Sequence, residues 1–124
     1  MSDARQNTDE TVTGADAPAV DAPIHVEGGD HFDTIVADHD VVLVDFYADW
    51  CGPCKMLEPI VESIAADTEA VVAKVDVDEY QDLAQRFSVQ GIPTLLLYAG
   101  GEQVERLVGM RDESSLRDFI AQYT

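Results

Sequence analysis

Basic residues are scarce in this sequence. Seven lysines and arginines stand against 25 aspartates and glutamates in 124 residues, giving a net charge of −18 at pH 7. Nucleic-acid binding needs clustered Lys and Arg, so the composition argues against it. The acidity has two interpretations: adaptation to a salt-rich cytoplasm, where screening weakens like-charge repulsion, or ordinary solubilising charge. Because only Lys55 and Lys74 are lysines, we favour salt adaptation.

Long apolar runs are also missing. The longest ones, such as Leu95–Ala99, are far shorter than the roughly 20 residues that span a bilayer. The residues after Met1 are polar and acidic, which is not the pattern of a signal peptide. We therefore expect a cytoplasmic protein with no membrane partner.

Cysteine occurs only twice, at Cys51 and Cys54. No thiol remains to crosslink distant parts of the chain, so the pair is explained by local chemistry or by chance. A zinc site would need about four ligands. The three histidines, His25, His31 and His39, all precede the strand before the cysteines, which makes zinc the weaker alternative and surface polar roles the stronger one.

The sequence divides into a tail and one domain. Residues 1–22 mix Asp, Thr, Ala, Gly, Gln and Pro and contain few branched aliphatic side chains, which predicts a flexible acidic tail. The remainder, 23–124, has the size and apolar content of a single globular domain.

The spacing of apolar residues predicts strands and helices that alternate along this domain. The run 41–48 is apolar on both faces apart from Asp45, which is typical of a central strand covered by helices on both sides. The Gly100-Gly101 pair predicts a hairpin, so the last two strands should be antiparallel. Asp112 is placed to cap the last helix. The expected strands lie at 24–26, 41–48, 71–75, 94–99 and 103–108.

Four helices are expected between and after these strands. The helix after the central strand should run from about 51 to 66, with Pro59 inside it; the last carries Leu116, Phe119, Ile120 and Tyr123 on one face. The helix from 51 presents a stripe of Met56, Leu57, Ile60, Val61 and Ile64. The result is an α/β fold: a mixed sheet of about five strands flanked by about four helices.

The cysteines lie where the central strand ends and this helix begins. Side chains three residues apart in a first helical turn are close enough to form a disulfide. At the helix start, free backbone N–H groups and the helix dipole stabilise a Cys51 thiolate relative to a free thiol. Cys54 lies deeper and is less accessible, which suits it to attack a mixed disulfide on Cys51.

Two segments closely resemble the thioredoxin family. They are Val44–Lys55, which contains the specific run Trp-Cys-Gly-Pro-Cys, and Gly91–Thr94. The resemblance covers the domain from about residue 24 onward but not the tail. It implies the thioredoxin fold and a protein-disulfide reductase that uses a reversible Cys51–Cys54 dithiol/disulfide pair, with no bound cofactor.

The resemblance also assigns roles to single residues. Cys51 is the attacking thiol, Cys54 the resolving thiol, and Asp45 a buried carboxylate that assists proton transfer. The residues implied for substrate binding are Trp50, Gly52, Pro53, Gly91, Ile92, Pro93, Thr94 and Gly109, with Pro93 in cis. Tyr47 departs from the pattern, because many thioredoxins have Trp there, and we expect this to affect packing and fluorescence.

Elementary electrostatics also indicates a functional role for Asp45. A carboxylate in an apolar strand is costly to ionise, so burial should raise its pKa toward the range of a general base. Lys74, the one charged residue in 71–75, is the expected partner of Asp45. The alternative for both residues is a purely structural ion pair.

The resemblance implies partners as well. Electrons would come from a separate thioredoxin reductase, dependent on a flavin and a nicotinamide or on ferredoxin, and would pass to disulfide-containing protein substrates; we expect a monomer acting as a general cytosolic electron donor. Two alternatives remain. An oxidase or isomerase on the same fold is disfavoured by Gly52-Pro53 and by the missing export signal. A redox-silent binding module is disfavoured by the two intact cysteines.

Overall fold

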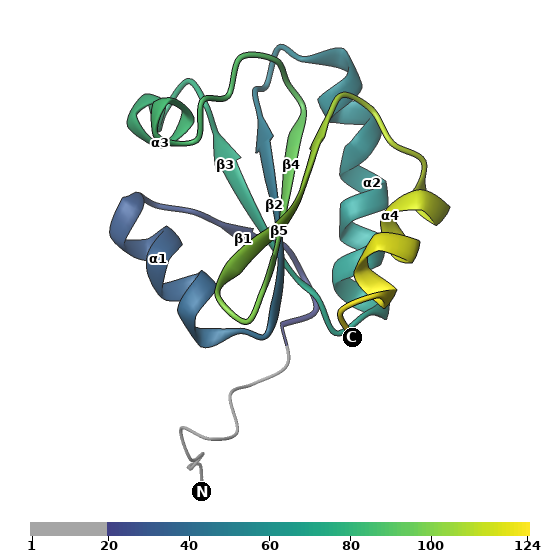
Figure 1. Cartoon of the computed structure of the whole chain (residues 1–124). Helices are drawn as coiled ribbons and strands as arrows, with labels where there is room; N and C mark the ends of the chain where they lie inside the picture. Colours follow the sequence, from purple (N-terminus) through teal and green to yellow (C-terminus); the bar gives the residue numbers. More distant parts are fainter. Residues whose placement is uncertain (1–19) are drawn as a thin grey trace, which may run out of the picture.

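The computed structural model describes residues 20–124, a five-stranded sheet between two pairs of helices (Figure 1). This confirms the expected α/β fold and the order of its elements. In chain order these are β1 (Ile24–His25), α1 (Gly29–Asp38), β2 (Val41–Tyr47), α2 (Gly52–Asp67), β3 (Val71–Asp76), α3 (Gln81–Arg86), β4 (Thr94–Ala99), β5 (Glu102–Val108) and α4 (Glu113–Ala121).

The strands lie in the order β1-β3-β2-β4-β5, so β2 is central, as its sequence predicts. β1 and β2 are parallel to β3, whereas β4 is antiparallel to β2 and β5 is antiparallel to β4. The hairpin is confirmed: Ala99 pairs with Glu102 across Gly100 and Gly101, whose φ angles of 61° and 84° suit glycine. The antiparallel alignment of β4 with β2 has no counterpart in the sequence pattern.

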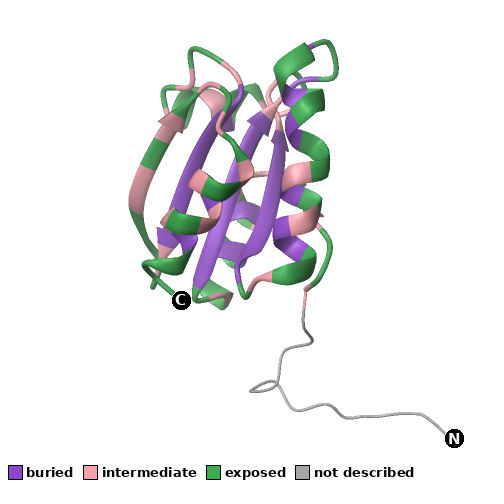
Figure 2. Ribbon diagram, turned by 90° about the vertical axis from the view of Figure 1, so that its right-hand side faces the viewer, coloured by how far each residue is buried: buried purple, intermediate pink, exposed green. Residues whose placement is uncertain are grey.

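Alternating side chains of β2 face two different layers of the core. Val42, Val44 and Phe46 pack with residues of α1 and α3, whereas Val41 and Leu43 pack with residues of α2 and α4. Figure 2 shows the buried residues concentrated in the sheet and on the inner sides of the helices. Because side chains two apart in a strand share a face, Asp45 lies on the side covered by α2 and α4.

Some local expectations need correction. Met56 is exposed, since it lies beside rather than within the buried row Leu57, Val61 and Ile64. Tyr123 lies beyond the end of α4 and is exposed. The predicted cap of α4 is present, because the Asp112 side chain accepts the N–H of Ser115 at 2.9 Å.

The predicted tail falls mostly on residues 1–19, which lie outside the described residues. Val20, which the sequence assigns to the tail, packs partly buried against the core. Among residues 20–124, no helix combines the length and the apolar character that crossing a membrane requires.

Candidate active site

Cys51 and Cys54 form a disulfide where β2 passes into α2, with their Cα atoms 5.2 Å apart. α2 begins at Gly52, one residue later than the expected start at about 51. Cys51 therefore immediately precedes the helix, and Cys54 lies in its first turn. The expected difference in accessibility is not seen in this oxidised form, because Cys51 is 4% and Cys54 2% exposed. Ala48, Ile92 and Val77 pack around the pair.

The sulfur of Cys51 caps α2. It accepts the backbone N–H of Cys54 at 3.2 Å, the role that a Ser or Asp oxygen commonly plays before a helix. Pro53 lies within the first turn, where its missing N–H leaves no helical bond unmade. A reduced Cys51 would therefore carry its sulfur where one N–H and the helix dipole favour a thiolate over a thiol.

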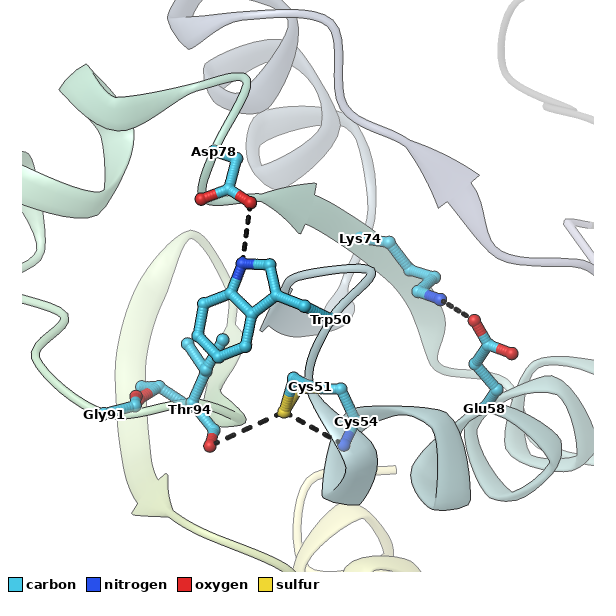
Figure 3. The surroundings of a disulfide bond; sticks show 9 residues. Trp50, Cys51, Cys54, Glu58, Lys74, Asp78, Gly91 and Thr94 are labelled. Carbon is cyan, nitrogen blue, oxygen red and sulfur yellow. Dashed lines mark hydrogen bonds and ion pairs between the residues drawn. A yellow bond between two sulfur atoms is a disulfide. The ribbon is translucent and has the colours of Figure 1, made fainter.

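The loop before β4 lies against the cysteines. The carbonyl oxygen of Ile92 is 3.9 Å from Sγ of Cys51, and the Ile92–Pro93 peptide bond is cis, as the resemblance implies. The Thr94 hydroxyl donates a hydrogen bond to the carbonyl of Gly91 (Figure 3), and the N–H of Gly109 donates to the carbonyl of Pro93 at 2.8 Å. The structure thus brings Gly91–Thr94 and Gly109 together beside the disulfide.

Trp50 is 69% exposed next to the disulfide, and its side chain is held in place. The indole Nε1–H donates a hydrogen bond to Oδ2 of Asp78 at 2.8 Å (Figure 3). Asp78 lies in a turn after β3, where Oδ1 of Asp76 accepts its backbone N–H. Sequence reasoning missed Asp78, since nothing in a turn sequence tells which distant donor it meets.

Asp45 is fully buried in β2, and neither carboxylate oxygen has a hydrogen-bond partner among the described residues. Desolvation raises its pKa from 3.8 to about 7; the positive charge of Lys74 opposes this rise and the negative charge of Glu58 adds to it. This carboxyl therefore changes its protonation state near neutral pH, as the sequence argument expects of a general base.

The ion pair that Lys74 forms differs from the predicted pair with Asp45. Lys74 lies beside Asp45 in the β2–β3 register, but its ammonium pairs with Glu58 of α2, with Nζ 3.6 Å from Oε2 (Figure 3). The ammonium also lies 4.3 Å from the centre of the Tyr47 ring. Desolvation raises the Tyr47 pKa to about 12, so the ring stays neutral and presents its π face to the cation.

Glu58 is a second residue that sequence reasoning missed. It follows Cys54 by four positions in α2, and residues four apart share one helix face. That spacing was the available signal, since it places an acidic side chain on the helix face that carries the resolving cysteine.

A metal site finds no support in residues 20–124. No group of three or more His, Cys, Asp or Glu side chains there is arranged to hold an ion. The Nδ1 of His31 instead accepts the backbone N–H of Glu27 at 2.9 Å. The redox group of the site is the cysteine pair itself.

A disulfide between two cysteines at the start of a helix, on this fold, is the redox site of a thiol-disulfide oxidoreductase. The family model described as Thioredoxin matches residues 23–122. The chain therefore belongs to the thioredoxin family.

Individual relatives agree with this assignment. A thioredoxin from Chlamydia caviae is 40% identical over 102 residues, which cover 82% of this chain and 99% of the relative. A bifunctional thioredoxin reductase/thioredoxin from Mycobacterium leprae is 39% identical over 92% of this chain and 25% of its own length. Among solved structures, a mutant thioredoxin from Halobacterium salinarum NRC-1 has 55% identity and a TM-score of 0.85, covering 88% of this chain and 96% of that one.

Proposed function

We propose that this oxidoreductase works as a reductase of protein disulfides and a general electron donor. The observation that carries the direction is the small number of hydrogen-bond donors around the Cys51 sulfur that could stabilise its thiolate after reduction. One backbone N–H reaches the Cys51 sulfur, and Gly52-Pro53 adds no side-chain donor between the cysteines. Oxidising members of such folds owe their power to a strongly stabilised reduced form, so weak support favours donation of electrons.

The reaction takes two exchanges. The Cys51 thiolate attacks one sulfur of a substrate disulfide, the substrate S–S bond breaks, and the other substrate sulfur leaves as a thiolate. Cys54, deprotonated, then attacks the Cys51 sulfur of the mixed disulfide. The second substrate sulfur leaves as a thiolate, and the Cys51–Cys54 disulfide remains, so two electrons have passed to the substrate.

Asp45 is our candidate for the base that takes the Cys54 proton, and Lys74 is the cation that lowers the pKa of Asp45. Three observations support this. Asp45 is buried on the sheet face covered by α2, the helix that carries Cys54; its pKa of about 7 suits a base near neutral pH; and neither oxygen is committed to a described hydrogen-bond donor.

The substrate is proposed to dock over the disulfide. Exposed Trp50 offers an apolar contact on one side, and the loop with the cis Ile92–Pro93 bond offers backbone groups on the other. The full set proposed for docking is Trp50, Gly52, Pro53, Gly91, Ile92, Pro93, Thr94 and Gly109.

Electrons are proposed to return from a thioredoxin reductase that depends on a flavin or on ferredoxin. The relative whose name joins thioredoxin reductase with thioredoxin supports a partner of this kind. We further propose a monomer in a reducing, cytoplasmic compartment of high salt. The net charge of −18 supports the salt assignment, because screening would relieve the repulsion it causes.

An insulin reduction assay tests the function. With dithiothreitol as the electron source, the wild-type chain should accelerate precipitation of the reduced insulin chains, and Cys51→Ser should not. Equal rates with wild type and with no added protein would leave a redox-silent binding module as the better description.

A further inference from the structure

Glu58 is half exposed at the surface of α2, yet it reaches into the buried part of the site. Its Oε2 is 3.6 Å from Nζ of Lys74, whose side chain is only 7% exposed (Figure 3). An ammonium that is this buried requires a nearby counter-charge. Glu58 supplies it from the helix face that carries Cys54.

Two acidic side chains, Asp45 and Glu58, lie near Lys74. The Cα of Lys74 is in register with that of Asp45 on the adjacent strand, so Asp45 is the anion that strand pairing alone would select. The ammonium instead lies between Glu58 and the Tyr47 ring, at 4.3 Å from the ring centre. Asp45 is left without a hydrogen bond from any described residue.

We propose that Glu58 is a positioning residue: by holding the Lys74 ammonium toward α2 and the Tyr47 ring, it prevents this cation from pairing with Asp45 and so keeps Asp45 available to the Cys54 proton. The inference rests on the proposed role of Asp45 in the reductase cycle. Glu58 contacts neither the substrate nor the cysteines and acts mainly through Lys74, beside the weaker effect of its own charge on Asp45.

The charged groups around Asp45 are few, which makes the effect of Glu58 separable. β3 contributes Lys74, α2 contributes Glu58, and β4 places the apolar Leu95 opposite Asp45. Tyr47 on the same strand is neutral. Lys74 and Tyr47 also line a cavity of about 470 Å³ whose other walls are His25, Val26, Glu27, Asp76, Glu79 and Tyr80.

Removing the charge of Glu58 should act on Asp45 in two ways with one sign. The negative charge that favours protonated Asp45 disappears, and the freed Lys74 ammonium can approach Asp45 and favour its ionised form. An opposite charge at contact distance lowers a carboxyl pKa by about 1 unit or more. For a fall of about 1 unit from about 7, the ionised fraction of Asp45 at pH 6 rises about fivefold.

The test is a pH titration of Asp45 in the oxidised full chain, followed by carbon NMR of labelled aspartate carboxyls. Glu58→Gln should lower the midpoint by about 1 pH unit. Glu62→Gln, the exposed residue one turn further along α2, is the matched control and should leave it in place. Equal midpoints in both variants would overturn the proposal.

A double-variant cycle shows whether Lys74 carries the effect. In a Lys74→Met background, which removes the ammonium but keeps most of the stem, Glu58→Gln should move the Asp45 midpoint by less than half as much. An undiminished movement would overturn the positioning role, because Glu58 would then act on Asp45 directly.

Insulin reduction separates this inference from the function on which it rests. Relative to wild type, Glu58→Gln should lower the rate at pH 8, where Asp45 is ionised in both proteins and the carboxylate paired with Lys74 is the weaker base, more than at pH 6, where the larger ionised fraction offsets part of the loss; Asp45→Asn should abolish that difference. If Asp45→Asn leaves wild-type turnover unchanged, the proton role of Asp45 fails, and with it the catalytic meaning of Glu58. If Asp45→Asn slows turnover but Glu58→Gln matches Glu62→Gln, the Glu58 proposal alone fails.

Discussion

Replacing Asp45 by Asn should raise the unfolding free energy of the oxidised protein by an amount that grows with pH. In the unfolded chain this carboxyl ionises near 3.8, whereas burial raises its pKa to about 7 in the fold. Between these values the folded state holds one more proton than the unfolded state. Wild-type stability therefore falls as pH rises from about 4 to about 7, and the cost is fully present above pH 7. Asn does not titrate and escapes this cost.

The size of the effect follows from the two pKa values. One pKa unit corresponds to about 1.4 kcal/mol, so the difference of about 3 units is worth about 4 kcal/mol. The gap in unfolding free energy between Asp45→Asn and wild type should thus widen by about 4 kcal/mol from pH 4 to pH 8. Any fixed cost of burying an Asn amide shifts the gap by a constant and leaves this pH dependence intact.

Urea unfolding followed by circular dichroism measures it, at several pH values and one potassium chloride concentration. Asp118→Asn, on the exposed side of α4, is the control and removes no buried carboxyl. A gap for Asp45→Asn that stays the same from pH 4 to pH 8 would refute the reasoning, because Asp45 would then ionise alike in both states.

Other predictions address the cysteines, the docking loop and the charge. Cys54→Ser should accumulate mixed disulfides on Cys51 with protein substrates, seen as thiol-reversible adducts on gels; the absence of adducts would contradict the order of attack. Gly109→Ala should lower the unfolding free energy by about 1 kcal/mol or more, because its φ is 92°, whereas Gly91→Ala meets only an ordinary contact at 3.7 Å and should cost less than about 0.5 kcal/mol. The melting temperature of the full chain should rise as potassium chloride increases from about 0.01 to 1 M, since the Debye length falls from about 30 to about 3 Å; a flat or falling curve would return the acidity to ordinary solubilising charge.

The sequence predicted most of what depends on local pattern. The central position of β2 followed from its apolar faces, the hairpin from Gly100-Gly101, and the cap of α4 from Asp112. Each of these features is decided by residues close together in the chain, where periodicity and turn chemistry are informative. The disulfide at the start of α2 belongs to the same group.

Contacts between distant segments were less predictable. Lys74 was expected to pair with Asp45, and strand register does place them side by side, but the ion pair forms with Glu58 on α2. The bond from Trp50 to Asp78 and the antiparallel alignment of β4 with β2 are of the same kind. These features depend on how distant strands and helices pack and on how long side chains are then directed, and neither composition nor spacing records that.

The reduction potential of the Cys51–Cys54 pair decides whether this protein reduces or oxidises protein disulfides. Equilibration of the full chain with dithiothreitol redox buffers, read by alkylation of the free thiols, gives the value. We expect a potential of about −270 mV, as in thioredoxins generally, at which the reduced pair donates electrons to protein disulfides. A potential of about −120 mV, as in strongly oxidising members of the fold, would contradict the reductase function and make the protein a donor of disulfides.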